Sequence, residues 1–186
     1  MSILLTEDTT FIVQGITGRE AMNLTRECLD YGKGAKVVGG VTPGKLGEEA
    51  HGVPGFDTVA QAVEAHGKPI DGSGLTVPPA FTKDAAFEAI ENGIKLLVIV
   101  TERIPRGDVA QIVEFAGVHG AQIIGPNCLG IIVPDVIKMG GIGGPAKDAA
   151  KSYTPGPIGV ISRSGGMTTE MSSALSAAGL GQSTAV

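Results

Sequence analysis

Two glycine-rich turns in this chain have residue types that can bind a phosphate group. Residues 15–18 (GITG) follow an apolar run at residues 11–13 and precede a helical pattern, and residues 162–166 (SRSGG) occupy the same kind of position later on. In a parallel α/β sheet, such a turn directs free backbone N–H groups and the positive end of a helix dipole beyond the strand. Both turns therefore predict a ligand that carries phosphate.

Each turn also has a purely structural interpretation. The first lacks the middle glycine of the G-x-G-x-x-G dinucleotide fingerprint, so a strand-to-helix turn without a ligand is its alternative. The second offers the small residues Ser162, Ser164, Gly165 and Gly166. Its hydroxyls and free N–H groups suit a phosphate, and its alternative is an ordinary helix N-cap.

Charged side chains at strand ends are further candidates. Lys45 follows a Pro-Gly turn, where it either neutralises a phosphate or is an ordinary surface lysine. Glu102 follows a buried apolar run, where it accepts hydrogen bonds from a ligand or caps the next helix with its charge. The three histidines, His51, His66 and His119, have no partner at the spacing of a catalytic triad or a metal site. We therefore predict no catalytic residue and no metal site.

The composition favours an α/β protein. Of the 186 residues 42% are hydrophobic, 29 are glycine, and only 4% are aromatic. Small and aliphatic residues suit closely packed layers of helix and sheet with many turns.

Charge and hydropathy exclude several partners. The net charge is −5 and the basic residues are scattered, so the sequence predicts no nucleic-acid partner and no membrane surface. The longest apolar run, residues 96–100, is far too short to span a membrane, and we expect a cytoplasmic protein. Cys28 and Cys128 lack metal-ligand spacing, and a disulfide is not expected.

A unit of strand, turn and helix recurs along the chain. Strands are predicted near residues 11–13, 36–40, 75–77, 94–100 and 121–125. The third is the poorest because residues 72–74 (GSG) are unfavourable in a strand. Successive right-handed crossovers predict a parallel sheet with helices on both faces and all functional turns at one edge.

The organisation changes after the fifth strand. Residues 1–128 are expected to form one domain and residues 129–156, which are rich in glycine and proline, an irregular connection. Residues 157–186 repeat the strand and helix, with Met171, Leu175 and Ala178 predicted to face inward. One such unit cannot enclose a core, so it is an incomplete second domain or docks on the first.

Taken together, these motifs resemble those of a known family. The segments are MSILLTEDTTFIVQGITG, VVGGVTPGK, TVPPAFTKDA, IVTERIP, IIGPNCLG, GVISRSGG and GLGQSTAV. In this order and over the whole chain they resemble the α-subunit of succinyl-CoA synthetase, the ADP- or GDP-forming succinate–CoA ligase. The resemblance implies a CoA-binding Rossmann-like domain and the start of a flavodoxin-like ligase domain. It also implies a β-subunit, in a heterodimer or heterotetramer, that binds ATP or GTP with Mg²⁺.

The resemblance also assigns site residues. Those implied to contact CoA or line its site are Thr17, Gly18, Arg19, Glu20, Lys45, Pro79, Ala80, Phe81, Val100, Thr101 and Glu102. Ser164 is implied to begin a helix whose N-terminus holds the transferred phosphoryl group. Ser162, Gly165 and Gly166 belong to the same phosphate-binding turn. The family's phosphorylated histidine belongs to a part of the second domain beyond Val186.

One position departs from the family pattern. Thr169 stands where similar α-subunits commonly carry a tyrosine associated with the carboxylate substrate. The default acid is the dicarboxylic acid succinate, and malate and the tricarboxylic acid citrate are alternatives, because malate–CoA ligase and citryl-CoA synthetase subunits share the architecture. On this interpretation the chain binds CoA without turning over by itself, and ATP and GTP are not distinguished.

Two other functions remain alternatives. One is a stand-alone CoA- or nucleotide-binding module without catalysis. The other is an NAD-dependent oxidoreductase domain, which is disfavoured by the missing middle glycine and by the absence of an acidic residue after residues 36–40.

Overall fold

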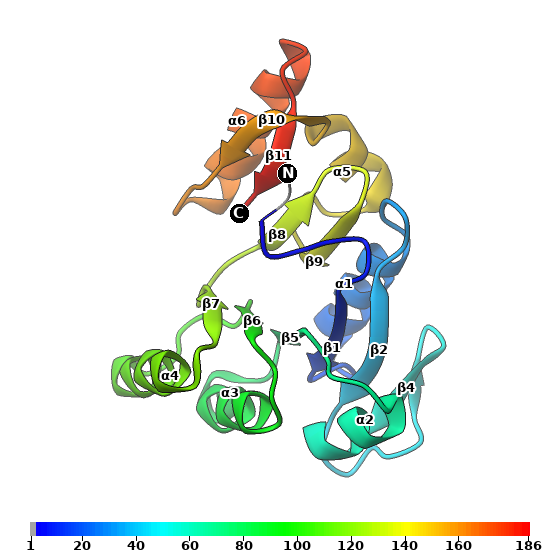
Figure 1. The fold of residues 1–186 in the computed structure, drawn as a ribbon, viewed down its shortest axis with the longest axis vertical. Helices are drawn as coiled ribbons and strands as arrows, with labels where there is room; N and C mark the ends of the chain where they lie inside the picture. The colour runs from blue at the N-terminus through cyan, green and yellow to red at the C-terminus, as the bar shows by residue number, and fades with distance from the viewer. Residues whose placement is uncertain (1–2) are drawn as a thin grey trace.

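The computed structural model describes residues 3–186, which form two β-sheets with flanking helices (Figure 1). The first part of the chain contains β1 (Thr10–Gln14), α1 (Arg19–Leu29), β2 (Lys36–Val41), β3 (Glu49–Ala50), β4 (Val53–Phe56), α2 (Val59–His66), β5 (Gly72–Leu75), the 3₁₀ turn η1 (Pro79–Phe81), α3 (Thr82–Glu91), β6 (Leu96–Ile99), α4 (Arg106–His119) and β7 (Gln122–Ile124). The second contains β8 (Gly130–Val133), β9 (Ile137–Gly140), α5 (Ala146–Ser152), β10 (Pro155–Val160), α6 (Gly165–Ala177) and β11 (Gln182–Ala185).

The first sheet confirms the expected α/β fold. Its strand order is β3-β4-β2-β1-β5-β6-β7, and every pair is parallel except β3 with β4. The chain moves from β1 to β2 on one side and returns to place β5 on the other. The switch point of the topology therefore lies between β1 and β5, where open α/β sheets bind their ligands.

Different elements cover the two faces of this sheet. One apolar cluster joins the sheet to α2, α3 and α4 through residues such as Val59, Ala86 and Ile112. A second cluster joins the opposite face to α1 and to the hairpin of β8 and β9, including Ile131 and Met139. The first sheet therefore has helices on both faces, and the second sheet completes the cover of one face (Figure 1).

Local sequence accounts for the helix boundaries. On α1, Ala21, Leu24 and Cys28 are buried as one stripe, as their spacing predicts. The helix α2 begins at a capping box in which the Thr58 side chain accepts a hydrogen bond from the Gln61 amide. It ends at Gly67 in the left-handed conformation expected of a glycine C-cap.

The third strand was predicted in the wrong place. The prediction put it at residues 75–77, whereas β5 spans Gly72–Leu75 and lies fully buried between β1 and β6. A side chain at Gly72 would meet Met139, with the Cβ only 3.0 Å from the methionine Cε. The glycine therefore leaves room for Met139 of β9, whose side chain would have to shift to admit a Cβ.

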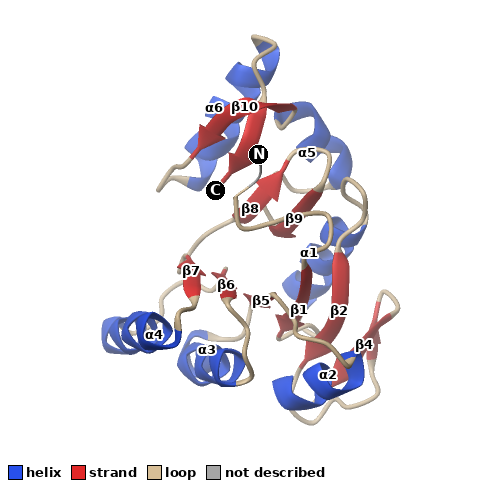
Figure 2. Cartoon of the chain, in the orientation of Figure 1, coloured by secondary structure: helices blue, strands red, loops and turns tan. Residues whose placement is uncertain are grey.

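Residues 129–156 also differ from the expected irregular connection. They contain β8, β9 and α5, and the second sheet has the order β10-β11-β8-β9. Its strands form a group separate from the first sheet in Figure 2, although Ile131 and Val133 pack into the first sheet's core. The segment is thus part of the folded structure of both sheets, and the division of the chain into domains stays a prediction.

The prediction for the inward face of α6 was wrong in part. The helix buries Thr168 and Ser172, and Leu175 packs against the core of the second sheet, whereas the predicted Met171 is 51% exposed. Ala178 follows the helix and is exposed. Periodicity favoured the apolar side chains, but the buried face carries small hydroxyl residues, of which Thr168 donates to the Ser164 carbonyl over 3.1 Å.

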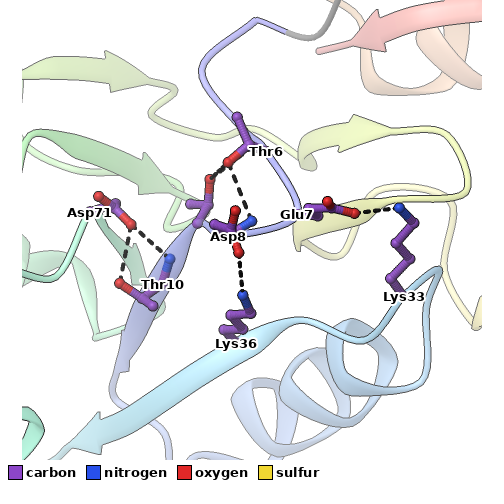
Figure 3. Close-up of polar contacts among 8 residues, drawn as sticks. Thr6, Glu7, Asp8, Thr10, Lys33, Lys36 and Asp71 are labelled. Carbon is purple, nitrogen blue, oxygen red and sulfur yellow. Dashed lines mark hydrogen bonds and ion pairs between the residues drawn. The ribbon is translucent and has the colours of Figure 1, made fainter.

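The segment before β1 ties the two sheets together. The Ile3 amide donates to Thr184 Oγ1 of β11 over 3.1 Å, and the buried Leu5 joins the first core. Figure 3 shows the next residues fixed to the first sheet, with Glu7 paired to Lys33 and Asp8 paired to Lys36 at 2.7 Å. The segment thus spans the junction between the two sheets.

Within residues 3–186, no helix combines the length and hydropathy needed to cross a membrane.

Candidate functional site

A cleft of about 1510 Å³ lies at the carboxyl edge of the first sheet. One wall consists of the chain just after β5, β6 and β7, together with residues of α1. The other wall belongs to the second sheet and includes residues after β10 and the beginning of α6. Its volume exceeds that of a pocket for a compact small molecule, and it suits an extended ligand.

Hydrogen bonds hold the strand ends of the first sheet together. The Thr76 hydroxyl donates to the Gln14 carbonyl over 2.8 Å, and the Thr101 hydroxyl donates to the Val77 carbonyl over 2.7 Å. The Asn127 amide donates to the Thr101 carbonyl over 3.0 Å. These bonds link the ends of β1, β5, β6 and β7, so the floor of the cleft is preformed.

The turn between β1 and α1 is closely packed against its neighbours. Gly15 has φ +85°, and a Cβ there would lie 3.1 Å from both Thr76 Oγ1 and the Val77 amide nitrogen. Behind the turn, a Cβ at Gly40 would come within 2.3 Å of Ile16. Glycine at position 40 is therefore a packing requirement, at the end of the strand where an NAD-binding domain carries an acidic residue.

Two helices begin at this cleft without a side-chain cap. The N-cap of α1 is Gly18 and that of α6 is Ser164, and neither makes a side-chain capping bond. The Ser162 hydroxyl instead accepts from the Ser164 amide over 3.1 Å and fixes the turn. The first amides of both helices thus keep N–H groups available to an anionic ligand.

The structure places only some of the predicted site residues in the cleft. Those that line it are Glu20, Pro79, Val100, Thr101, Glu102, Ser162 and Gly165. Those that lie outside its lining are Thr17, Gly18, Arg19, Lys45, Ala80, Phe81, Ser164, Gly166 and Thr169. They lie in the turns after β1, β2 and β10, in η1, or on α1 and α6, and the roles given to them remain predictions.

Thr17 lies in the turn after β1, and Lys45 lies in the turn after the neighbouring strand β2. The Lys45 ammonium is exposed and pairs with Glu48 at 2.8 Å, which raises the pKa of the lysine. The Thr17 hydroxyl donates to Thr42 Oγ1 over 3.3 Å, so the β1 turn is joined to the turn that carries Lys45. Because the exposed pair of Lys45 and Glu48 is weak, an anionic group above these turns could replace Glu48 as the partner of the Lys45 ammonium.

Thr169 makes its hydrogen bond inside the protein. Its hydroxyl lies 3.0 Å from the hydroxyl of Tyr153, a fully buried residue after α5. Burial raises the pKa of Tyr153 above its ordinary value, so this tyrosine is neutral at physiological pH. A role for Thr169 in choosing the acid remains a prediction.

One cleft residue was not identified from the sequence. Glu27 lines the cleft and was missed, although it lies seven residues after Glu20 and thus on the same side of α1. Arg103 and Asn127, which follow predicted strands, also line the cleft, in the left-handed conformation with φ of 59° and 53°.

A buried lysine stands behind the cleft. The Lys138 side chain is fully inaccessible, and burial lowers its pKa. Its ammonium lies 3.5 Å from Glu27 Oε2 and 3.2 Å from the Ile142 carbonyl, and it also donates to the Gly144 carbonyl.

Among residues 3–186, no group of three or more metal-ligating side chains is suited to hold a metal ion.

Both thiols are protonated at neutral pH. Burial raises the pKa of Cys28 and that of Cys128 from 9.0 to about 11. Cys28 donates to the Gly140 carbonyl at 3.4 Å, and Cys128, which lines the cleft, lies 3.3 Å from the Ile99 carbonyl. Because the thiolate is the nucleophile, neither cysteine is activated for covalent chemistry.

Alkaline pH should test the environment of Cys28. Above pH 9 the unfolded chain releases this proton while the folded chain keeps it to about pH 11, so stability falls as pH rises. We expect the stability difference between the wild type and Cys28→Ala to shrink by about 2 kcal/mol between these pH values. Urea unfolding at each pH measures this difference, and parallel curves for the two proteins would contradict the assignment.

The fold and the cleft define a Rossmann-like α/β domain with a ligand site at the switch point of its sheet. The CoA binding domain family matches residues 6–103, more than half of the chain, and the chain belongs to this family. The α-subunit of an ADP-forming succinate–CoA ligase from Methanothermobacter thermautotrophicus is 45% identical over 184 residues, covering 99% of this chain and 59% of its own length.

Further comparisons agree with this assignment. An α-subunit of the same type from Archaeoglobus fulgidus is 44% identical over 100% of this chain and 60% of its own length. The chain thus spans about 60% of the curated relatives that it matches. ATP citrate lyase from Methanothrix soehngenii has a TM-score of 0.86 at 20% identity over 98% of this chain and 31% of that chain, a likeness of fold alone.

Proposed function

We propose that this chain is the CoA-binding part of the α-subunit of a succinate–CoA ligase. The observation that carries the proposal is the cleft at the switch point of a sheet that belongs to the CoA binding domain family. Its volume and the two uncapped helix N-termini fit an elongated ligand with several phosphates. CoA contributes the thiol that becomes the thioester of the product.

The residues divide this task between binding and positioning. The amides at the beginning of α1 hold the pyrophosphate, and Lys45 and Arg19 neutralise further phosphate charge. Thr101 and Glu102 line the cleft and form hydrogen bonds with the neutral parts of the ligand. The α6 turn, around Ser164, receives the phosphoryl group that activates the acid.

The remaining parts of the reaction belong to the complete enzyme. A phosphohistidine in the rest of the subunit transfers the phosphoryl group, and a β-subunit supplies the ATP or GTP site with its Mg²⁺. The proposed compartment is the cytoplasm. Succinate is the proposed acid because two relatives that are 45% and 44% identical are succinate–CoA ligase subunits.

Calorimetric titration of the chain with CoA tests the proposal. We expect micromolar binding of CoA, weaker binding of dephospho-CoA, and no comparable binding of NAD. The matched ligands separate recognition of the 3′-phosphate from recognition of a general dinucleotide. A folded chain that binds NAD as well as CoA, or binds neither, would contradict the proposal.

Lys45 provides a sharper test of the phosphate site. We expect Lys45→Ala to weaken CoA binding by about 1–3 kcal/mol, the range for a charged hydrogen bond. Lys151→Ala is the matched control, since Lys151 is also exposed and paired with a carboxylate, Asp148, at 3.0 Å on α5. Equal CoA affinity in the wild type and Lys45→Ala would remove Lys45 from the site.

A further inference from the structure

A polar stripe on α1 faces the cleft along the length of the helix. It comprises Glu20, Asn23 and Glu27, and the buried Leu24 lies beside it. These positions recur at intervals of three and four residues, so they lie above one another on one side of the helix. The stripe runs from the phosphate end of the proposed site toward the junction with the second sheet.

Glu27 lies too far along this stripe to contact a phosphate held at the helix N-terminus. Nine residues separate it from Gly18, which corresponds to about 13 Å along the helix axis. Its carboxylate also repels phosphate. A ligand held at the beginning of α1 must therefore present a different, neutral group at Glu27.

The carboxylate of Glu27 is held in place from behind. Its side chain is 24% exposed, whereas the Lys138 side chain that faces it is fully buried. Lys138 has no other acidic partner among residues 3–186, and its remaining hydrogen bonds go to the carbonyls of Ile142 and Gly144. The Lys138 ammonium thus joins α1 to the glycine-rich loop after β9 (residues 141–144). Residues of α1 and of this loop line the cleft.

Burial of a lysine in this way is costly for stability. A buried charge needs close partners to offset its lost hydration. An apolar residue of similar volume in its place often gives an equal or higher free energy of unfolding. The cation does, however, fix the position of Glu27 and partly balances its charge. The carboxylate is then suited to accept a hydrogen bond from a neutral N–H or O–H donor.

We propose that Glu27 binds the amide-bearing pantetheine arm of CoA and that Lys138 is the positioning residue for Glu27. This inference rests on the proposed CoA function and extends it to the neutral half of the ligand. The phosphates lie at the beginning of α1, and an amide N–H of the arm donates to Glu27 farther along the helix. Lys138 does not touch the ligand.

Titration with two ligands tests the proposal. CoA is compared with 3′-phosphoadenosine 5′-diphosphate, which has the same phosphates but lacks the pantetheine arm. We expect Glu27→Ala and Lys138→Met each to weaken CoA about 10-fold, the effect of losing a charged hydrogen bond, and to leave the shorter ligand unchanged. Glu27→Gln keeps an acceptor oxygen and should retain more CoA affinity than Glu27→Ala.

The controls separate positioning from a general effect on structure. Glu7→Ala breaks an exposed carboxylate–lysine pair outside the cleft lining (Figure 3) and should change neither affinity. Equal losses for both ligands, or unchanged CoA affinity, would overturn the proposal. If Lys138→Met does not fold, the Glu27 variants decide the outcome alone. A wild type that binds the shorter ligand as tightly as CoA overturns this inference, whereas one that binds neither contradicts the proposed function itself.

Discussion

Replacing Met139 by alanine is expected to lower the free energy of unfolding by about 2–5 kcal/mol, the cost of a large-to-small change in a core. Met139 is fully buried in β9 and packs into the cluster that contains Phe11 and Val13 of the first sheet. Its sulfur and methyl group lie against Gly72, where no side chain can replace the lost contact. The resulting cavity would therefore open between the two sheets.

The same variant tests whether the two sheets unfold together. The chain has no tryptophan, and its two tyrosines, Tyr31 and Tyr153, are buried in the cluster of the second sheet. Tyrosine fluorescence thus reports on the second sheet, while circular dichroism reports on the whole chain. We expect coincident transitions in the wild type, both shifted in Met139→Ala.

A matched methionine controls for loss of the side chain itself. Met171 lies on α6 and is 51% exposed, so Met171→Ala should change stability by less than about 0.5 kcal/mol. If Met139→Ala were equally mild, the hairpin of β8 and β9 would not be part of the first core. Separate transitions for the two probes would instead indicate two independent units.

Replacing Gly15 by alanine is expected to be the second large effect, on both stability and CoA affinity. A non-glycine residue at φ +85° costs about 1–2 kcal/mol. The new Cβ would also lie 3.1 Å from the backbone of Val77, and relief of such a contact costs a further 1–3 kcal/mol or so. We expect a total loss of about 2–5 kcal/mol in the free energy of unfolding.

Gly67 separates the two contributions. It has φ +70°, and no atom lies within 4 Å of a Cβ built there, so Gly67→Ala carries only the backbone cost. The excess destabilisation of Gly15→Ala measures the packing of the β1 turn against the end of β5. The excess should be accompanied by weaker CoA binding, because the turn and the amides of α1 would move together. Equal stability losses in the two variants would show that this close approach has no energetic role.

Much of the first sheet could be predicted because its signals are local. The stripe of Ala21, Leu24 and Cys28 specifies the buried side of α1, and the pair of Thr58 and Gly67 specifies both ends of α2. Repetition of strand, turn and helix then restricts the topology, since parallel crossovers have one hand. The two strand-to-helix turns followed from the same rules, and a phosphate-binding role for them stays a prediction.

Only the tertiary structure decided where β5 and the second half of the chain lie. Gly72 is unfavourable in a strand by local propensity, yet it leaves room for the close approach of Met139, 67 residues later. The apolar residues of β8 and β9 cover a face of the first sheet, so a segment rich in glycine and proline became ordered structure. Periodicity likewise misplaced the inward face of α6, which buries Thr168, bonded to the Ser164 carbonyl, and Ser172.

The sequence by itself determined the fold class and the positions of the strand-to-helix turns at one edge of the first sheet, because each depends on neighbouring residues. The second wall of the cleft, and the ammonium of Lys138 behind Glu27, depend on residues 111 positions apart. No local pattern encodes such a pairing, because it arises from burial and charge compensation when the two sheets pack together.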